Sequence, residues 1–386
     1  MPVLFLVIFV NMIGFGMIFP LLPIFKIEFL LTDLQVGYIA SIFAVFSLFG
    51  TLFFGILCDK FGRKYTLSIA LLLGGIVYFL TGYSQSYMEL LIYRGLSGFL
   101  TSCFVITFAI TSDISDDSNK FRYMGILGAA FSLGFILGPA IGGYLAGDSN
   151  NIDEINLAMP FVVAGAVSLL AGVLSIIFLR ETLSKEDRSL EKQANLVQSI
   201  KELYTNKKIV LFTYLTILLS LVMAGIEVYL SVWLNENFNL TARDMGYYWG
   251  LFGAVITISQ LALPRFFSAK QALIGGFLIF GLSCLLLLFA TNIYILIILS
   301  IFMAMGMGII FPSINVNLAI SGAKNEQGLI FGVNQSFGNL GRIIGPYALG
   351  WMFFISPNAV WIAIAVICLL TALLVLQFLE KESKQV

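Results

Sequence analysis

The chain has 386 residues, of which 59% are apolar and 11% are charged, and its 21 basic residues balance its 21 acidic residues. A soluble domain carries about 25% charged and 45–50% apolar residues, so both values indicate an integral membrane protein. So little charge excludes a disordered chain, a coiled coil and a nucleic-acid-binding protein. The absence of His excludes His-ligated metal sites and Ser-His-Asp triads. The four cysteines lack CxxC spacing, so we expect buried thiols and no metal or other cofactor.

Twelve apolar segments are long enough to cross a membrane, since a helix needs about 20 apolar residues to do so. They lie near residues 3–25, 36–58, 65–84, 88–112, 121–146, 158–180, 209–235, 244–264, 271–290, 293–319, 327–353 and 357–379. The first is not a cleavable signal peptide, because it lacks a basic start and carries Pro20 and Pro23 where a cleavage site would be. The predicted fold class is an all-α membrane protein with twelve transmembrane helices.

The basic residues predict the orientation of these helices. If the N-terminus is cytoplasmic, all but four of the 21 basic residues fall on the cytoplasmic side. Lys26 and Arg243 then lie outside, and Arg94 and Arg342 lie within spans. Under the positive-inside rule both termini are therefore cytoplasmic, and we expect a multi-pass protein of the bacterial inner membrane.

The chain divides into two halves that resemble each other. We predict a six-helix bundle over 1–180, a cytoplasmic linker with an amphipathic helix over 181–208, and a second six-helix bundle over 209–386. The glycine pattern of span five recurs in span eleven with an offset of 207 residues: Gly125, Gly134, Gly138-Pro139 and Gly143 correspond to Gly332, Gly341, Gly345-Pro346 and Gly350. Chance clustering of small residues at packed helices is the alternative, but the shared register favours a duplicated, pseudo-symmetric transporter.

Three motifs resemble those of the major facilitator superfamily. The loop between spans two and three, Gly55-Ile-Leu-Cys-Asp59-Lys-Phe-Gly62-Arg63-Lys64, is similar to the signature loop of that superfamily. The span-five series with Gly125, Gly134, Gly138, Pro139, Gly142 and Gly143 resembles the antiporter motif of its drug:proton exporters. Leu91 to Gly98, with Arg94, is similar to part of their span-four motif, and other segments resemble the twelve-span tetracycline/proton antiporters. The acidic residues of spans one and three and the His of span eight in those antiporters are missing here.

The resemblance implies roles for two of these motifs. Arg63 is expected to bridge to Asp113, with Asp59 nearby, in a cytoplasmic gate that also includes Gly55, Gly62 and Lys64. Ordinary surface pairing is the alternative. The span-five glycines and the Pro139 kink are expected to seal the interface between the halves, and simple close packing is the alternative.

Charged residues inside spans identify the candidate transport site, because each costs at least about 2.5–3.5 kcal/mol on insertion scales. Only Arg94, Glu227 and Arg342 lie clearly inside spans. Glu227 is the mid-span carboxylate and the predicted proton carrier, unless a permanent pair with Arg342 or Arg94 makes it structural. Further cavity candidates are Asn11, Gln260, Asn334, Gln335, Asn339, Tyr229 and Trp233, although each alone fits ordinary packing.

Together these features predict a transporter and not an enzyme: a secondary exporter of a small organic molecule, driven by proton antiport, that alternates access between two bundles. An uptake symporter or facilitator is the alternative, against which the antiporter glycines argue. A membrane enzyme would need paired carboxylates or a His, and Asp116-Asp117 lacks the second pair expected of a metal site. With two in-span arginines and one carboxylate, the cargo is expected to be anionic, zwitterionic or neutral, and Arg342 is its predicted anion contact. We expect a monomer with protons and the lipid bilayer as its other partners.

Overall fold

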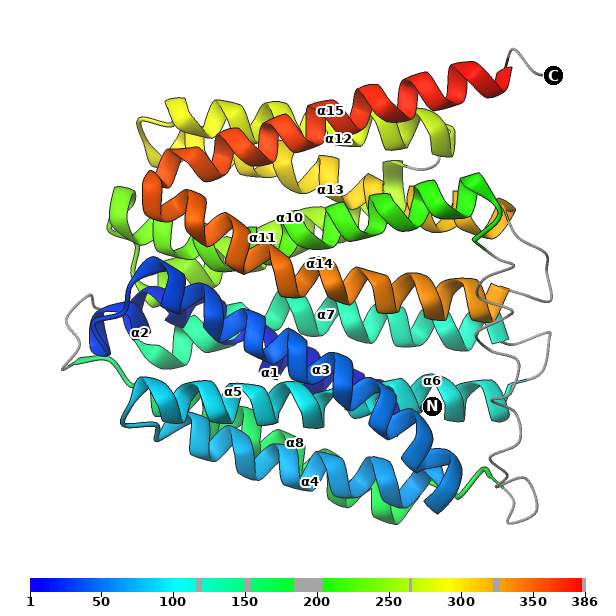
Figure 1. Ribbon diagram of the computed structural model, residues 1–386. Helices are drawn as coiled ribbons and strands as arrows, with labels where there is room; N and C mark the ends of the chain where they lie inside the picture. Colours follow the sequence, from blue (N-terminus) through cyan, green and yellow to red (C-terminus); the bar gives the residue numbers. More distant parts are fainter. Residues whose placement is uncertain (116–119, 149–153, 184–203, 264–265, 322–326, 384–386) are drawn as a thin grey trace. The chain divides into compact units, whose positions relative to one another are not determined.

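The computed structural model describes residues 1–115, 120–148, 154–183, 204–263, 266–321, 327–383, and the regular secondary structure within these ranges is helical (Figure 1). Of the predicted linker over 181–208, which was expected to contain an amphipathic helix, residues 184–203 lie outside the described residues. Asp116-Asp117 also lies outside them.

The first six predicted spans are present as helices. Spans one and four are each built from consecutive helical pieces that include a short 3₁₀ turn. In chain order the elements are α1 (Pro2–Gly16), η1 (Phe19–Leu21), α2 (Leu22–Glu28), α3 (Asp33–Phe61), α4 (Arg63–Gly82), α5 (Tyr87–Thr101), η2 (Ser102–Phe104), α6 (Val105–Asp113), α7 (Lys120–Ala146) and α8 (Ala158–Phe178).

The last six spans are also helical. They comprise α10 (Lys207–Phe238), α11 (Ala242–Ala262), α12 (Ala269–Leu286) with η6 (Leu287–Phe289), α13 (Ile293–Ser321), α14 (Gln327–Ile355) and α15 (Pro357–Ser383). Within the described residues, ten helical segments are both long and apolar enough to cross a membrane. The other two long helices, α11 and α14, carry more polar residues, among them Gln260 and Asn334. The predicted all-helical membrane fold is confirmed.

Local sequence signals explain where several helices begin and end. Thr32 and Gln35 form a capping box that starts α3, and Ser268 and Gln271 form another that starts α12. At the other end of α3, Gly62 adopts φ +97°, which L side chains rarely adopt. Because Gly62 alone separates α3 from α4, this glycine makes the sharp reversal between them possible.

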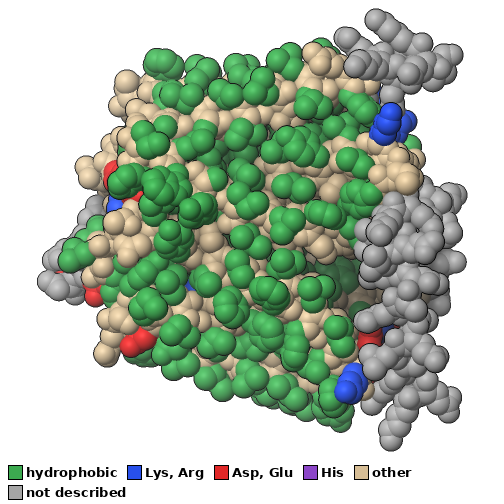
Figure 2. Space-filling model, in the orientation of Figure 1, with side chains coloured by type: hydrophobic (Ala, Val, Ile, Leu, Met, Phe, Trp, Pro, Cys, Tyr) green, Lys and Arg blue, Asp and Glu red, His purple; other side chains and the backbone are tan. Residues whose placement is uncertain are grey.

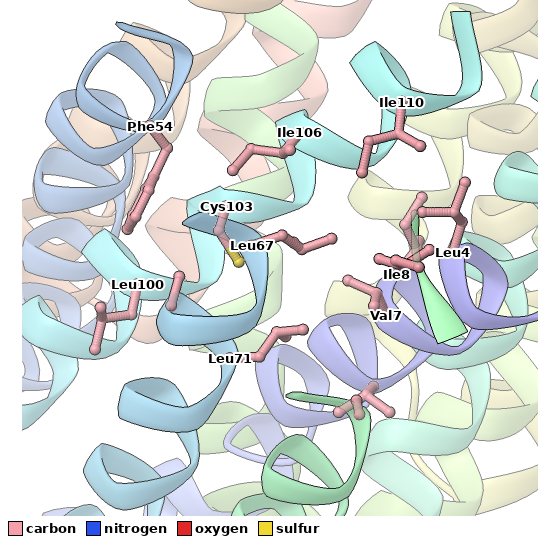
Figure 3. Packing of buried hydrophobic residues seen from close by; sticks show 14 of the residues in the cluster. Leu4, Val7, Ile8, Phe54, Leu67, Leu71, Leu100, Cys103, Ile106 and Ile110 are labelled. Atoms are coloured by element: carbon pink, nitrogen blue, oxygen red, sulfur yellow. The ribbon is translucent and has the colours of Figure 1, made fainter. Parts of the chain in front are cut away.

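The chain forms two compact units. Unit 1 comprises Met1–Ala194 and Leu234–Gly250, and unit 2 comprises Asn195–Trp233 and Leu251–Val386. In the core of unit 1, apolar side chains of α1, α4 and α6 pack together, with Leu4, Leu67 and Ile106 among them (Figure 3). Cys103 lies in this core, and all four cysteines are buried free thiols.

Large apolar side chains also cover much of the surface. On the face drawn in Figure 2, hydrophobic side chains predominate and charged ones are sparse. Phe49, Leu170, Phe289 and Leu370, from four different helical segments, are each at least half exposed. Soluble monomers rarely expose contiguous apolar patches larger than a few hundred Å², so this surface is suited to lipid.

The predicted internal repeat recurs in the helix contacts. In unit 1, α7 packs on α1: a Cβ on Gly134 would lie 2.6 Å from the Phe9 carbonyl oxygen, and one on Gly138 would lie 2.7 Å from that of Ile13. In unit 2, α14 packs on α10 in the same way, with Gly341 and Gly345 against the carbonyl oxygens of Ile217 and Leu221. Matching glycines therefore seat matching helices, as a duplicated bundle requires.

Candidate functional site

The candidate transport site contains a partly buried ion pair in unit 2. Arg342 Nη2 on α14 lies 2.7 Å from Glu227 Oε2 on α10. The Glu227 side chain is 4% exposed and that of Arg342 is 29% exposed. The close seating of α14 on α10 at Gly341 and Gly345 brings these two positions together. In this structure Glu227 therefore compensates the charge of Arg342, as the alternative of a permanent pair describes, and the role of Arg342 as an anion contact stays a prediction.

Arg94 is in the opposite situation. Its side chain on α5 is buried in unit 1, and its guanidinium lies over the Phe43 ring, 4.5 Å from the centroid. Neither Nε nor Nη1 has a hydrogen-bond partner among the described residues. A cation–π contact offsets only part of the cost of desolvating a guanidinium. Arg94 is thus a buried cation that lacks a counter-charge in the part of the chain that the structure describes.

The amide side chains among the cavity candidates differ in how deeply they are buried. Asn11 is buried and donates from Nδ2 to the Val7 carbonyl oxygen within α1 (2.9 Å). Asn334 is buried, and its Oδ1 has no partner among the described residues. Gln260 and Asn339 are half-buried and Gln335 is exposed. Their role as cargo contacts remains a prediction.

Tyr229 and Trp233 are packed tightly inside unit 2. The Tyr229 hydroxyl donates to the Pro346 carbonyl oxygen (2.8 Å), and its ring stacks on Phe353. Trp233 makes an edge contact with Trp361, with centroids 5.5 Å apart. In this structure these two aromatic rings contact protein side chains, as the packing alternative describes.

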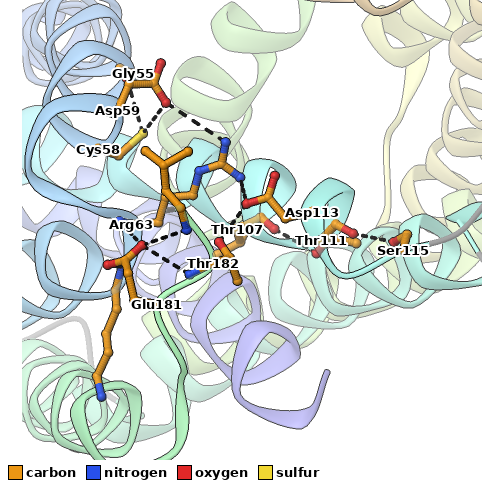
Figure 4. A network of polar contacts seen from close by, with 12 residues as sticks. Gly55, Cys58, Asp59, Arg63, Thr107, Thr111, Asp113, Ser115, Glu181 and Thr182 are labelled. Atoms are coloured by element: carbon orange, nitrogen blue, oxygen red, sulfur yellow. Dashed lines mark hydrogen bonds and ion pairs between the residues drawn. The ribbon is translucent and has the colours of Figure 1, made fainter. Parts of the chain in front are cut away.

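A polar network lies at the α3–α4 turn of unit 1 (Figure 4). We call Asp59, Arg63, Asp113, Glu181 and Thr182 the gate cluster. Arg63 makes an ion pair with Asp113 and a longer contact of 4.0 Å with Asp59. The Thr182 hydroxyl donates to the same Asp113 carboxylate (2.6 Å). The structure thus contains the expected bridge from Arg63 to Asp113, whereas its gating role remains a prediction.

Glu181 is a member of this cluster whose position the sequence pattern did not predict. Its carboxylate accepts the backbone N–H groups of Arg63 (2.9 Å) and Lys64 (3.2 Å) at the start of α4. These N–H groups have no partner within the helix, and a carboxylate there also interacts favourably with the helix dipole. The Arg180-Glu181-Thr182 segment therefore fastens the end of the first six spans to the α3–α4 turn.

The motif glycines differ in how tightly they are packed. Gly134, Gly138 and Gly142 lie against the α1 side of unit 1, where Gly142 faces Met17, and Gly143 lies against Ala242 and Gly246 of α11. Pro139 lies inside α7. A Cβ on Gly55 or Gly125 would meet nothing within 4 Å, so neither glycine serves a close approach here.

A second charged group, not predicted from the sequence, lies at the other end of α3. We call Lys26, Asp33, Asp148, Glu236 and Arg243 the outer cluster. Lys26 Nζ lies 2.5 Å from Asp33 and 2.6 Å from Glu236, and Arg243 Nη1 lies 3.1 Å from Asp148. Lys26 and Arg243 are the two basic residues that the orientation rule left outside, and that exception was the available signal.

No group of three or more His, Cys, Asp or Glu residues that could hold a metal occurs in the described part of the chain. The described residues contain two charge centres within the membrane-spanning helices, Glu227–Arg342 and Arg94, and ionic contacts at both ends of α3. Charges inside membrane-spanning helices are typical of sites that bind a substrate or an ion.

The family of the chain follows from comparison with known proteins. The Major Facilitator Superfamily model matches residues 4–268 and 265–386, and the chain belongs to this superfamily of membrane transporters of small molecules. The all-helical fold agrees with this assignment.

Two curated relatives are multidrug resistance proteins. The chain is 31% identical over 360 residues to Multidrug resistance protein 1 of Bacillus subtilis, covering 91% of this chain and 89% of the relative. It is 28% identical over 372 residues to Quinolone resistance protein NorA of Staphylococcus aureus, covering 94% and 92%.

Solved structures share the fold at low identity. A bacterial homolog of the human lysosomal transporter Spinster, in an inward-facing and occupied conformation, matches with a TM-score of 0.83 and 14% identity over 97% of this chain and 95% of that chain. The human organic anion transporter MFSD10 matches with a TM-score of 0.70 and 19% identity over 97% and 98%.

Proposed function

We propose that this protein exports amphiphilic small molecules in exchange for protons, by alternating access between its two six-helix bundles. The observation that carries the proposal is the buried Glu227–Arg342 pair. It is net neutral when Glu227 is ionised and carries one positive charge when Glu227 is protonated. A proton therefore changes the charge of a buried site by a full unit, and a cargo that senses this charge is coupled to the proton by reciprocal linkage.

The relatives and the motifs support export as the direction of transport. Two relatives bear names that denote drug or quinolone resistance. The antiporter glycines, from Gly134 to Gly143, form close helix contacts. Both features support export over uptake. We place the protein as a monomer in the bacterial inner membrane, with both termini in the cytoplasm.

The cargo is proposed to be anionic, zwitterionic or neutral, with a strong hydrogen-bond acceptor. Arg342 is compensated by Glu227, whereas Arg94 is buried with two nitrogens that lack a partner among the described residues. Arg94 therefore replaces Arg342 as the expected contact for the acceptor group of the cargo. The guanidinium would become accessible in a state other than the present one.

Everted membrane vesicles with an imposed pH gradient test this function. A panel of fluorescent cations, quinolone-type zwitterions and organic anions is added, and cargo uptake and proton release are followed together. We expect gradient-dependent uptake and proton efflux with the zwitterions or anions. Glu227→Gln should abolish both, whereas the exposed-carboxylate control Glu28→Gln should not. Uphill transport by Glu227→Gln equal to wild type would overturn the coupling role.

A further inference from the structure

The outer cluster joins distant parts of the sequence through two separate ionic contacts. Glu236, at the end of α10, contacts Lys26 of α2, 210 residues away in sequence. Arg243, at the start of α11, contacts Asp148, which follows α7 and is 95 residues away. The Thr241 hydroxyl also donates to Asp148 (3.0 Å). The short α10–α11 connection is therefore held on both sides by the first half of the chain, within unit 1.

Directly beside these contacts the helices approach closely. A Cβ on Gly143 of α7 would lie 2.9 Å from the Gly246 Cα of α11. In return, a Cβ on Gly246 would lie 2.8 Å from the Pro139 carbonyl oxygen. Met245, next to this seam, is fully buried. The charged contacts and the glycine seam occupy the same end of unit 1, so separating one opens the other.

The charge arrangement permits the contact to break without leaving Lys26 unneutralised. Lys26 Nζ binds Asp33 (2.5 Å) of its own half as well as Glu236 (2.6 Å). When Glu236 leaves, Asp33 remains. The side chains of these two ion pairs, Lys26–Glu236 and Arg243–Asp148, are between 23% and 52% exposed, so water solvates the separated partners. Exposed pairs of this kind are weak, which suits a contact that must open in every cycle.

We propose that Lys26–Glu236 and Asp148–Arg243 form an ionic latch that holds the extracytoplasmic end of the carrier closed. The latch rests on the proposed function, since it presupposes a carrier that opens alternately at its two ends. It selects the closed state, and the glycine seam between α7 and α11 excludes water once that state forms. The gate cluster lies at the other end of α3, so each end of this helix has its own network of charged residues.

Thiol labelling tests the latch without any cargo. Met245→Cys places a reporter beneath it, and a membrane-impermeant maleimide is applied to intact cells. The parent chain gives the background, because its four cysteines are buried. Glu236→Gln removes the latch contact and spares Lys26–Asp33, and Asp148→Asn breaks the second pair. Each should raise the labelling rate about two- to five-fold, and the double variant should combine both effects.

Three controls make the outcome decisive. Asp33→Asn breaks the local pair only and should not accelerate labelling. Asp148→Arg should accelerate it, and Asp148→Arg combined with Arg243→Asp should restore slow labelling. High salt should narrow the difference between the parent reporter and Glu236→Gln, because screening weakens exposed pairs.

The latch is refuted if Glu236→Gln and Asp148→Asn, each combined with Met245→Cys, label at the rate of Met245→Cys alone. It is also refuted if the charge exchange fails to restore slow labelling. Failure of the proposed function gives a different result: no pH-driven transport by the parent protein, with the accelerated labelling of the latch variants intact. The failure of the latch and the failure of the proposed function are therefore distinguishable.

Discussion

Leu349 of α14 lies directly against Gly225 of α10, where any added Cβ would collide with the leucine side chain. The corresponding contact of the first half has the sizes exchanged: Gly142 of α7 takes the small side and Met17 the large one. Each half of the duplicated chain thus keeps one large and one small residue at this helix crossing. The pair, and not the individual glycine, fills the space, as close packing requires.

Exchanging the sizes in the second half tests this complementarity. Gly225→Met should collide with Leu349 and lower stability by about 1–3 kcal/mol, the usual penalty for overpacking. Adding Leu349→Gly reproduces the first-half arrangement and should recover most of the loss. Thermal unfolding of purified protein in detergent measures both. Gly332→Ala on α14 serves as the control, because a Cβ added at Gly332 would meet nothing within 4 Å. A double variant less stable than Gly225→Met alone would show that the exchange is incidental.

The Glu227–Arg342 pair predicts different effects on stability and on coupling. Glu227→Gln removes the carboxylate that neutralises Arg342, and removing one partner of a buried pair destabilises by about 3–5 kcal/mol. Because Arg342 is 29% exposed, the loss should lie at or below the lower end of that range. Adding Arg342→Gln removes the isolated charge and should restore thermal stability while gradient-driven transport stays absent.

Cargo exchange without a gradient separates coupling from folding in these variants. Exchange in proteoliposomes should survive in the double variant, because binding and movement do not require the proton. If the double variant regains uphill transport as well as stability, the pair is structural and another group carries the proton.

The fold was accessible from sequence because hydrophobic length and charge placement act over whole helices. All twelve expected segments are helical within a few residues of their predicted ends. The contact between Arg63 and Asp113 could also be predicted, because the loop motif resembles that of a family in which such a bridge is expected. Charge pairing between distant segments could not be predicted in this way. The Lys26–Glu236 contact joins residues 210 positions apart, and no local sequence pattern indicates it. Nor could the sequence decide whether Arg342 or Arg94 is compensated, since this depends on which helix faces each residue.

The gate cluster predicts non-additive effects. Arg63→Ala and Asp113→Asn break the same ion pair, so each should favour the inward-open state and their combination should add little. Glu181→Gln weakens a different contact, the carboxylate at the start of α4, and its effect should add to either. Labelling of a cysteine at the cytoplasmic mouth reports the shift. Fully additive effects of Arg63→Ala and Asp113→Asn would mean that the two residues act separately.

The state of Arg94 gives the last prediction, which concerns both stability and cargo. An uncompensated buried cation carries a desolvation cost that an apolar residue of similar shape does not. Arg94→Met should therefore leave the unfolding temperature unchanged or raise it in the absence of cargo, in contrast to Glu227→Gln. Arg94 should nevertheless be required for cargo that bears a carboxylate.

A charge-assisted hydrogen bond contributes about 1.5–3 kcal/mol, so Arg94→Met should weaken binding of a zwitterionic or anionic cargo by about 10- to 150-fold. Arg94→Lys keeps the charge but loses the planar fork, and should recover only part of that affinity. Binding of a lipophilic cation should not weaken in either variant. Cargo-dependent thermal stabilisation measures these affinities on purified protein. Strong destabilisation of Arg94→Met without cargo, combined with equal loss of affinity for cations and anions, would assign Arg94 a structural role instead.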